Sequence, residues 1–230
     1  MEPNASRPEE TMPAVRGDEF TSIAQALGAR IRSERERAGL SGRELARRVS
    51  LSHSLISQIE RGHITPSVAT LWSITRALSL SVADLFSDAE ERDSSAGRGR
   101  TAPGPVQPHE TRAILGLEGG VRWERLTSTC DDEVDFIQIV YPVGGASCDE
   151  DALSRHAGKE YGYVISGRLG VKVGFEMFEL GPDDSISFDA TVPHRLWTIG
   201  DEPVRAIWTV VGPGLPHVRR TGEKSALTAG

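Results

Sequence analysis

The chain lacks most of what would mark a disulfide-stabilised or membrane protein. It has only two cysteines, Cys130 and Cys148, in 230 residues, and they do not form the CxxC pair of a zinc or redox site. Such low cysteine usage is typical of a reducing cytoplasm. No apolar run approaches the roughly 18 residues that a membrane-spanning helix needs, and residues 1–18 contain no apolar signal segment. We therefore expect a cytoplasmic location and no membrane partner.

Lysine is also scarce, and charge is divided unevenly along the chain. The formal net charge is −7, but residues 20–88 have nine arginines against six acidic residues. Residues 110–230 have twelve basic against nineteen acidic residues. Since DNA binding requires a basic face to neutralise phosphates, only the first region suits it. The acidic second region would repel DNA, which leaves its surface free for a different ligand.

Helical periodicity is confined to the first region. Ile23, Leu27 and Ile31 recur every four residues, Pro66 precedes another apolar stripe, and Val82 begins a short last segment, so we predict five helices. Residues 89–109 are rich in Ser, Gly, Pro and charged residues without a period, as in a flexible linker. The predicted organisation is a disordered tail at 1–19, a helical domain at 20–88, the linker at 89–109, a second domain at 110–215 and a tail at 216–230.

Two short helices joined by a tight turn are predicted between Leu40 and Gly62. Ser41 precedes Glu44 by three residues, the spacing of a capping box, and Ser52 can cap the second helix. Ile56 and Ile59 share the buried face of that helix, and a glycine ends it. The remaining face is small, polar and uncharged, so the helix can enter the major groove of DNA.

This pattern resembles the XRE (Cro-like phage-repressor) helix-turn-helix family from Ile23 to Phe86. The resemblance implies that His53, Ser54 and Gln58 contact bases in operator DNA, and that an ion pair between Arg35 and Glu60 joins the first helix to the recognition helix. The alternative is a helical module that binds protein. The full set of predicted DNA-contacting residues is Ser41, Arg43, Ser52, His53, Ser54, Leu55, Ser57, Gln58 and Arg61.

Beyond the linker the apolar period changes from 3.6 to 2. Strand-like segments separated by glycine turns predict an all-β sandwich or barrel, and they occupy residues 121–126, 135–141, 160–165, 169–173, 177–180, 185–188, 194–198 and 204–211. The predicted fold class is therefore α plus β, with two domains.

The second domain resembles the cupin family, a jelly-roll barrel with an internal site. The matching residues are His156, Glu160, Gly167 and His194, whereas Ser154 stands where a metal-binding cupin has a histidine. Two histidines and one carboxylate (His156, Glu160 and His194) can still form a facial triad for a divalent metal. We favour a metal-free pocket of Ser154, His156, Glu160 and His194 that binds a small polar effector. A third interpretation makes the histidines hydrogen-bonded core residues.

We thus predict a homodimeric transcriptional regulator that binds operator DNA and senses a small molecule, without catalytic residues. Two alternatives remain. A metal-dependent cupin oxygenase or isomerase joined to a DNA-binding domain would need the metal, and a pure interaction protein would have a filled barrel. The sequence identifies neither the operator nor the effector.

Overall fold

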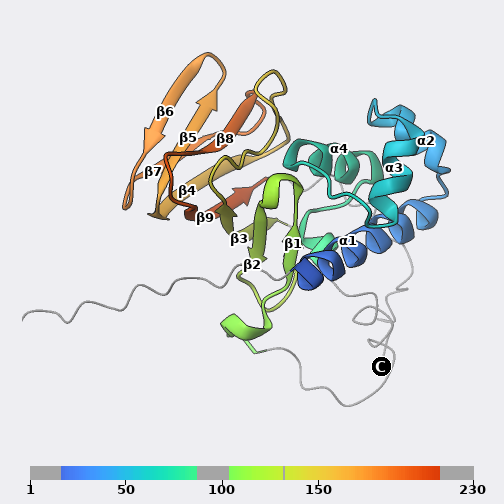
Figure 1. Cartoon of the computed structure of the whole chain (residues 1–230). Helices are drawn as coiled ribbons and strands as arrows, with labels where there is room; N and C mark the ends of the chain where they lie inside the picture. Colours follow the sequence, from blue (N-terminus) through green and yellow to red (C-terminus); the bar gives the residue numbers. More distant parts are fainter. Residues whose placement is uncertain (1–16, 87–103, 132, 213–230) are drawn as a thin grey trace, which may run out of the picture.

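The computed structural model describes residues 17–86, 104–131 and 133–212 (Figure 1). Residues 17–86 form a helical domain and residues 104–212 a β domain. The helical domain contains α1 (Gly17–Arg37), α2 (Gly42–Arg48), α3 (His53–Glu60) and α4 (Val68–Leu78). The prediction of five α-helices was wrong in this part of the chain, because Ala83–Phe86 forms the 3₁₀ turn η1. Four residues suffice for one 3₁₀ turn but are too few for a further α-helix.

Helices α1 and α3 cross with almost no space between their backbones. A Cβ atom on Gly28 of α1 would lie 2.3 Å from the carbonyl oxygen of Ile59. Gly62, with φ of +67°, ends α3 as predicted; its N–H donates to Ile59 O, and the N–H of His63 donates to Gln58 O. These two bonds form a Schellman motif. The two glycines therefore let α1 support the recognition helix at close range.

The β domain consists of two antiparallel sheets. One sheet has the order β1-β2-β3-β9-β4-β7 and the other the order β6-β5-β8. The eight predicted strands are present, and β1 was missed because it is only three residues long. The strands are β1 (Ile114–Gly116), β2 (Arg122–Arg125), β3 (Val134–Tyr141), β4 (Lys159–Ser166), β5 (Arg168–Val173), β6 (Glu176–Leu180), β7 (Ser185–Asp189), β8 (His194–Ile199) and β9 (Val204–Val211), with 3₁₀ turns at His109–Thr111 and Glu118–Gly120.

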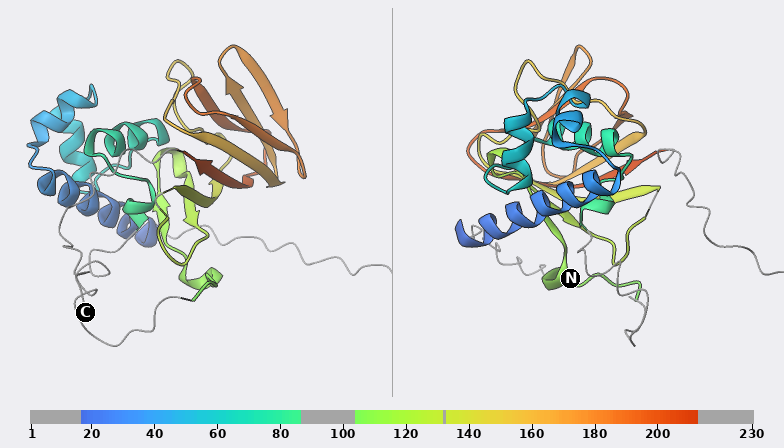
Figure 2. Two further views of the ribbon diagram at one scale, coloured as in Figure 1. Left: turned by 180° about the vertical axis from the view of Figure 1, so that it is seen from behind. Right: turned by 90° about the vertical axis from the view of Figure 1, so that its right-hand side faces the viewer.

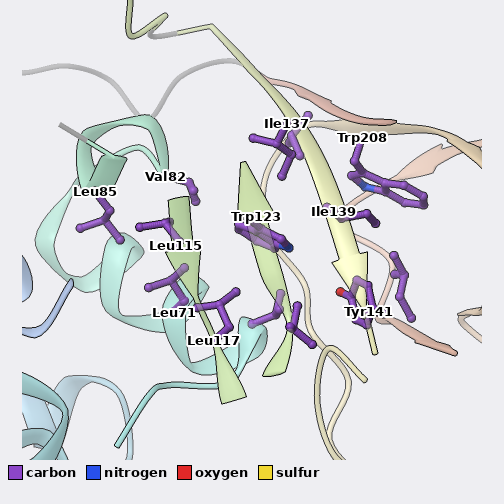
Figure 3. Close-up of a cluster of buried hydrophobic side chains, with 14 of the residues drawn as sticks. Leu71, Val82, Leu85, Leu115, Leu117, Trp123, Ile137, Ile139, Tyr141 and Trp208 are labelled. Carbon is purple, nitrogen blue, oxygen red and sulfur yellow. The ribbon is translucent and has the colours of Figure 1, made fainter. Parts of the chain in front are cut away.

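A single hydrophobic core runs through both domains. Figure 3 shows side chains of the helical domain next to those of β1 and β2, which in turn lie next to the interior of the β domain. The labelled members of this series are Leu71, Val82, Leu85, Leu115, Leu117, Trp123, Ile137, Ile139, Tyr141 and Trp208. The two domains are thus packed against each other, which the sequence did not predict.

Backbone and side-chain contacts reinforce this packing. Helix α1 lies against β1, where a Cβ on Gly116 would be 3.1 Å from the ring of Phe20. The N–H of Glu118 donates to Pro66 O at 3.0 Å. The views in Figure 2 show the helical domain against one end of the β domain. Much of the predicted linker and both predicted tails lie outside the described residues, so those boundaries remain predictions. Among the described residues, no helix is long and apolar enough to cross a membrane.

We expect Gly28→Ala to lower the free energy of unfolding by about 1–3 kcal/mol, because the added methyl group must displace the backbone of α3. In an exposed helix the same change would raise stability by about 1 kcal/mol, so the sign is diagnostic. Urea unfolding measures it, with Ala29→Ser at the neighbouring exposed position as the control. A stability equal to or above that of the wild type would contradict the close crossing.

Candidate functional site

The N-terminal part of α3 is a polar, uncharged surface. His53 and Ser54 are exposed, Ser57 and Gln58 are partly exposed, and the first turn contains no charged residue. Figure 1 shows α2 and α3 at the end of the helical domain farthest from the sheets. Leu55, which the sequence places among the DNA-contacting residues, has a half-buried side chain that packs against the core. Only the edge of this side chain is therefore accessible on the polar surface.

Serine hydroxyls hold the starts of both helices of the motif. Ser41 Oγ accepts from the N–H of Glu44, and Ser52 Oγ accepts from the N–H of Leu55, each at 3.1 Å. The capping box is only half formed, because the Glu44 carboxylate pairs with Arg47 and Arg48 instead. These caps fix where each helix begins and so where its first side chains point.

Two further predicted DNA-contacting residues flank this surface. Arg43 is exposed on α2 and makes no ion pair with any described residue. Arg61, at the end of α3, donates to Ser57 Oγ. Most other arginines of the helical domain are paired with glutamates, so Arg43 is the more available cation for a phosphate.

The predicted ion pair between the first helix and the recognition helix is present. Arg35 Nε and one terminal nitrogen donate to the two oxygens of Glu60 at 2.6 and 3.0 Å, and the other terminal nitrogen donates to Leu40 O. The hydrogen bond to Glu60 raises the pKa of Arg35 more than burial lowers it. A bidentate pair of this kind fixes the orientation as well as the distance between α1 and α3.

In the β domain the four residues of the predicted pocket come together. Glu160 lies on β4, His194 begins β8, and Ser154 pairs with His194 through two backbone hydrogen bonds of 2.8 and 2.9 Å. His156 precedes β4. All four side chains are buried, and the hydroxyl of Ser154 has no hydrogen-bond partner among the described residues.

Glu160 is the centre of this cluster. Its Oε1 lies 2.6 Å from His156 Nε2 and 3.2 Å from His194 Nε2. Burial raises the pKa of Glu160, but the two imidazoles outweigh that effect and bring the pKa to about 2. For His194 burial lowers the pKa, but the interaction with Glu160 outweighs this effect and raises the pKa above its usual value. The carboxylate therefore stays charged although it is buried.

The second oxygen of Glu160 is held by a tryptophan from another strand. Trp208 Nε1 on β9 donates to Glu160 Oε2 at 2.8 Å. The indole reaches this point because Gly162 lies beneath it, where any Cβ would be only 2.0 Å from the ring. Glu160 thus has one fixed oxygen and one that faces the two histidines.

A side chain from the helical domain closes the cluster. Trp72 of α4 stacks on the ring of His156, with centroids 3.8 Å apart and planes at 15°, and meets Trp123 edge-on at 6.3 Å. The space left inside the β domain beside Ser154, Glu160 and His194 is only about 20 Å³. This holds about one water molecule, so the expected effector-sized space inside the barrel is absent.

Comparisons with known proteins find a match for each of the two domains. The profile of a helix-turn-helix domain matches residues 26–85, and that of a cupin domain matches residues 139–210. The chain therefore combines a helix-turn-helix domain with a cupin domain.

Two curated relatives in Escherichia coli span most of this regulator. The HTH-type transcriptional regulator PuuR is 25% identical over 74% of this chain and 85% of its own. The HTH-type transcriptional regulator SutR is 23% identical over 80% of this chain and 93% of its own. An HTH_3 family transcriptional regulator from Vibrio cholerae shares the fold, with a TM-score of 0.59 and 21% identity over 84% of this chain and 99% of that one.

The cupin cluster of this regulator has the donors for a divalent metal. The Nδ1 atoms of His156 and His194 each lie close to a backbone carbonyl, at 3.1 and 2.9 Å, which leaves both Nε2 atoms directed toward Glu160. These two nitrogens and the carboxylate offer ligand atoms within 4.8 Å of one another. Backbone carbonyls that orient histidines in this way are common around metal ions. The residues fit a three-ligand metal, and they equally form a closed ion-pair cluster without one.

Sequence reasoning missed two residues of this site. Trp208 follows the inward parity of Ala206 and Val210 on its strand, so the alternation could have placed it inside the barrel. Trp72 lies beside the apolar stripe of α4 rather than on it, and a large aromatic residue there indicates a second packing surface.

We expect Ser154→His to bind Ni²⁺ at least about tenfold more tightly than the wild type, a gain of about 1.4 kcal/mol. The new imidazole would add a fourth ligand beside His156, Glu160 and His194. Isothermal titration after treatment with a chelator measures this, thermal unfolding checks the fold, and exposed Ser187→His is the control for an added surface histidine. Stoichiometric, equally tight metal in the wild type would contradict our preference for a metal-free pocket.

Proposed function

We propose that the protein binds operator DNA through α3 and that its cupin domain adjusts this binding in response to a small molecule. The observation that carries the first half is the uncharged, polar start of α3, which is held by the Ser52 cap and by the Arg35–Glu60 pair. A rigid helix with short polar side chains can approach base edges closely. PuuR and SutR, which resemble this chain over most of its length, are named as transcriptional regulators.

The second half of the proposal rests on the contact between the domains. Because Trp72 of α4 stacks on His156, a change at the cupin cluster alters the surface on which the helical domain rests. An effector shifts DNA affinity only if it binds two arrangements unequally, and coupling of about 1–3 kcal/mol is typical. The cytoplasmic location expected from the sequence remains a prediction.

We also propose a homodimer, since operators of this kind present two half-sites about one helical turn apart. Tyr161, Tyr163 and Ile165 form an exposed stripe on the outward side of β4, with 46%, 43% and 40% of their surfaces accessible. Apolar and aromatic side chains gathered on one sheet face are typical of a surface that a second copy covers.

We expect Gln58→Ala to relax specificity at one base position, at a cost of about 1–3 kcal/mol, because glutamine can bond adenine through both its donor and its acceptor. An oligonucleotide selection first identifies the preferred duplex, and competition binding against all single-base changes then measures the loss. Ser73→Ala, at an exposed position of α4, is the control. An unchanged base preference would show that α3 is not the element that reads sequence.

We expect Arg43→Ala to weaken binding about equally for all duplexes, since a phosphate contact carries no sequence information. The slope of log K against log salt concentration should fall by about 1. Titrations at several salt concentrations measure the slope. A loss confined to the preferred duplex would instead make Arg43 a base-reading residue.

A further inference from the structure

A second, larger cavity lies between the helical and cupin domains. Its volume is about 380 Å³, in the range of small-molecule sites. Residues of α4 and the turn after it, from 72 to 81, form one wall. The start of β3, the segment around His156 and the end of β9 form the other. A molecule bound there would touch both domains at once.

This cavity adjoins the buried cupin cluster without entering it. Trp72 and Val210 line both the 380 Å³ cavity and the 20 Å³ space inside the barrel, so these two residues lie between them. His156, stacked on Trp72, also lines the larger cavity. An occupant would therefore rest on the ring pair that joins α4 to the cupin domain.

The lining carries both signs of charge around an apolar wall. Arg76 and Arg155 are exposed and make no ion pair or side-chain hydrogen bond with any described residue. Arg155 is exposed between the buried residues Ser154 and His156, and it lines the cavity. The group of negative charge comprises the acidic residues Asp131, Glu133 and Asp135 around the start of β3.

The acidic group is partly organised by the backbone. Asp131 Oδ1 accepts from the N–H groups of Glu133 and Val134, at 2.8 and 3.2 Å, which fixes this turn. Trp72, Leu80 and Val210 supply apolar lining in the same cavity. A pure anion would face three carboxylates, and a pure amine would face two guanidinium groups. A molecule with both charges matches both groups, and mismatched charges would select against the other two classes.

We propose that this interdomain cavity binds a small zwitterion, an amino acid or a similar amine-carboxylate, with its apolar part against Trp72. Arg155 and Arg76 bind the carboxylate, for which the guanidinium fork is suited. Glu133 and its acidic neighbours bind the ammonium group. The inference rests on the proposed regulatory function and assigns the effector to this cavity instead of the barrel interior.

The location gives the ligand a direct route to DNA affinity. Helix α4 follows the recognition helix α3 in the chain and packs in the same core. A zwitterion that binds one spacing of α4 and β3 better than another shifts the population toward that spacing. No movement of the cupin strands is needed for this coupling.

The test uses the full-length protein and isothermal titration with each standard amino acid. For every amino acid that binds, the matched decarboxylated amine and deaminated acid are titrated as well. We expect at least one amino acid to bind ten or more times as tightly as both of its single-charge analogues. The proposal is overturned if no amino acid binds, or if either analogue binds as tightly as the zwitterion.

Two substitutions then locate the site. Arg155→Met is expected to lower affinity for the amino acid and the acid at least tenfold but to leave affinity for the amine unchanged. Glu133→Gln is expected to lower affinity for the amino acid and the amine at least tenfold but to leave affinity for the acid unchanged. Both residues are exposed, so thermal unfolding should be unaltered, and Lys172→Met outside the cavity is the control. Unchanged affinities in both variants would overturn the assignment to this cavity.

An oligonucleotide selection on the same preparation separates this inference from the proposed function. Lack of any duplex preference would refute the regulatory function itself. A clear duplex preference together with failed titrations would refute only the zwitterion site.

Discussion

The stacking of Trp72 on His156 is the contact on which the rest of the structure depends. One ring belongs to the helical domain and the other to the cupin cluster, and the core around them is continuous. Trp72 also lines the space inside the barrel, which has room for about one water molecule. Trp72 and His156 both line the larger cavity between the domains. The two domains therefore form one packed body among the described residues.

Rigidity at the DNA-binding end has a different physical origin. The bidentate Arg35–Glu60 pair fixes α1 against α3, and the glycines at their crossing bring the two backbones together. Serine caps set where the helices begin. A helix held in this way presents its side chains in one orientation, which sequence-specific contacts require. All of these contacts lie within the helical domain.

The cupin cluster combines a buried charge with its compensation. Burial raises the pKa of Glu160, but two imidazoles bring it down to about 2, so the carboxylate remains ionised. The indole N–H of Trp208 binds its other oxygen. A carboxylate buried without such partners would be strongly destabilising. Ser154 marks the departure from a four-ligand metal site, since its hydroxyl is buried beside the cluster and bonds to no described residue. The donors that remain still fit a metal, and they also form a satisfied cluster without one.

Local patterns in the sequence determined the helix-turn-helix, its caps, its terminal glycine and eight of the strands, because each depends on residues only a few positions apart. The resemblance to known families added the Arg35–Glu60 pair and the grouping of His156, Glu160 and His194. Only the tertiary structure decided that Leu55 is half-buried, that residues 83–86 form a single 3₁₀ turn and that Trp72 closes the barrel. It also placed Arg155 and a group of acidic residues on the lining of one cavity between the domains. These features depend on packing between segments distant in the chain, and no periodicity within either segment specifies which surface will cover it.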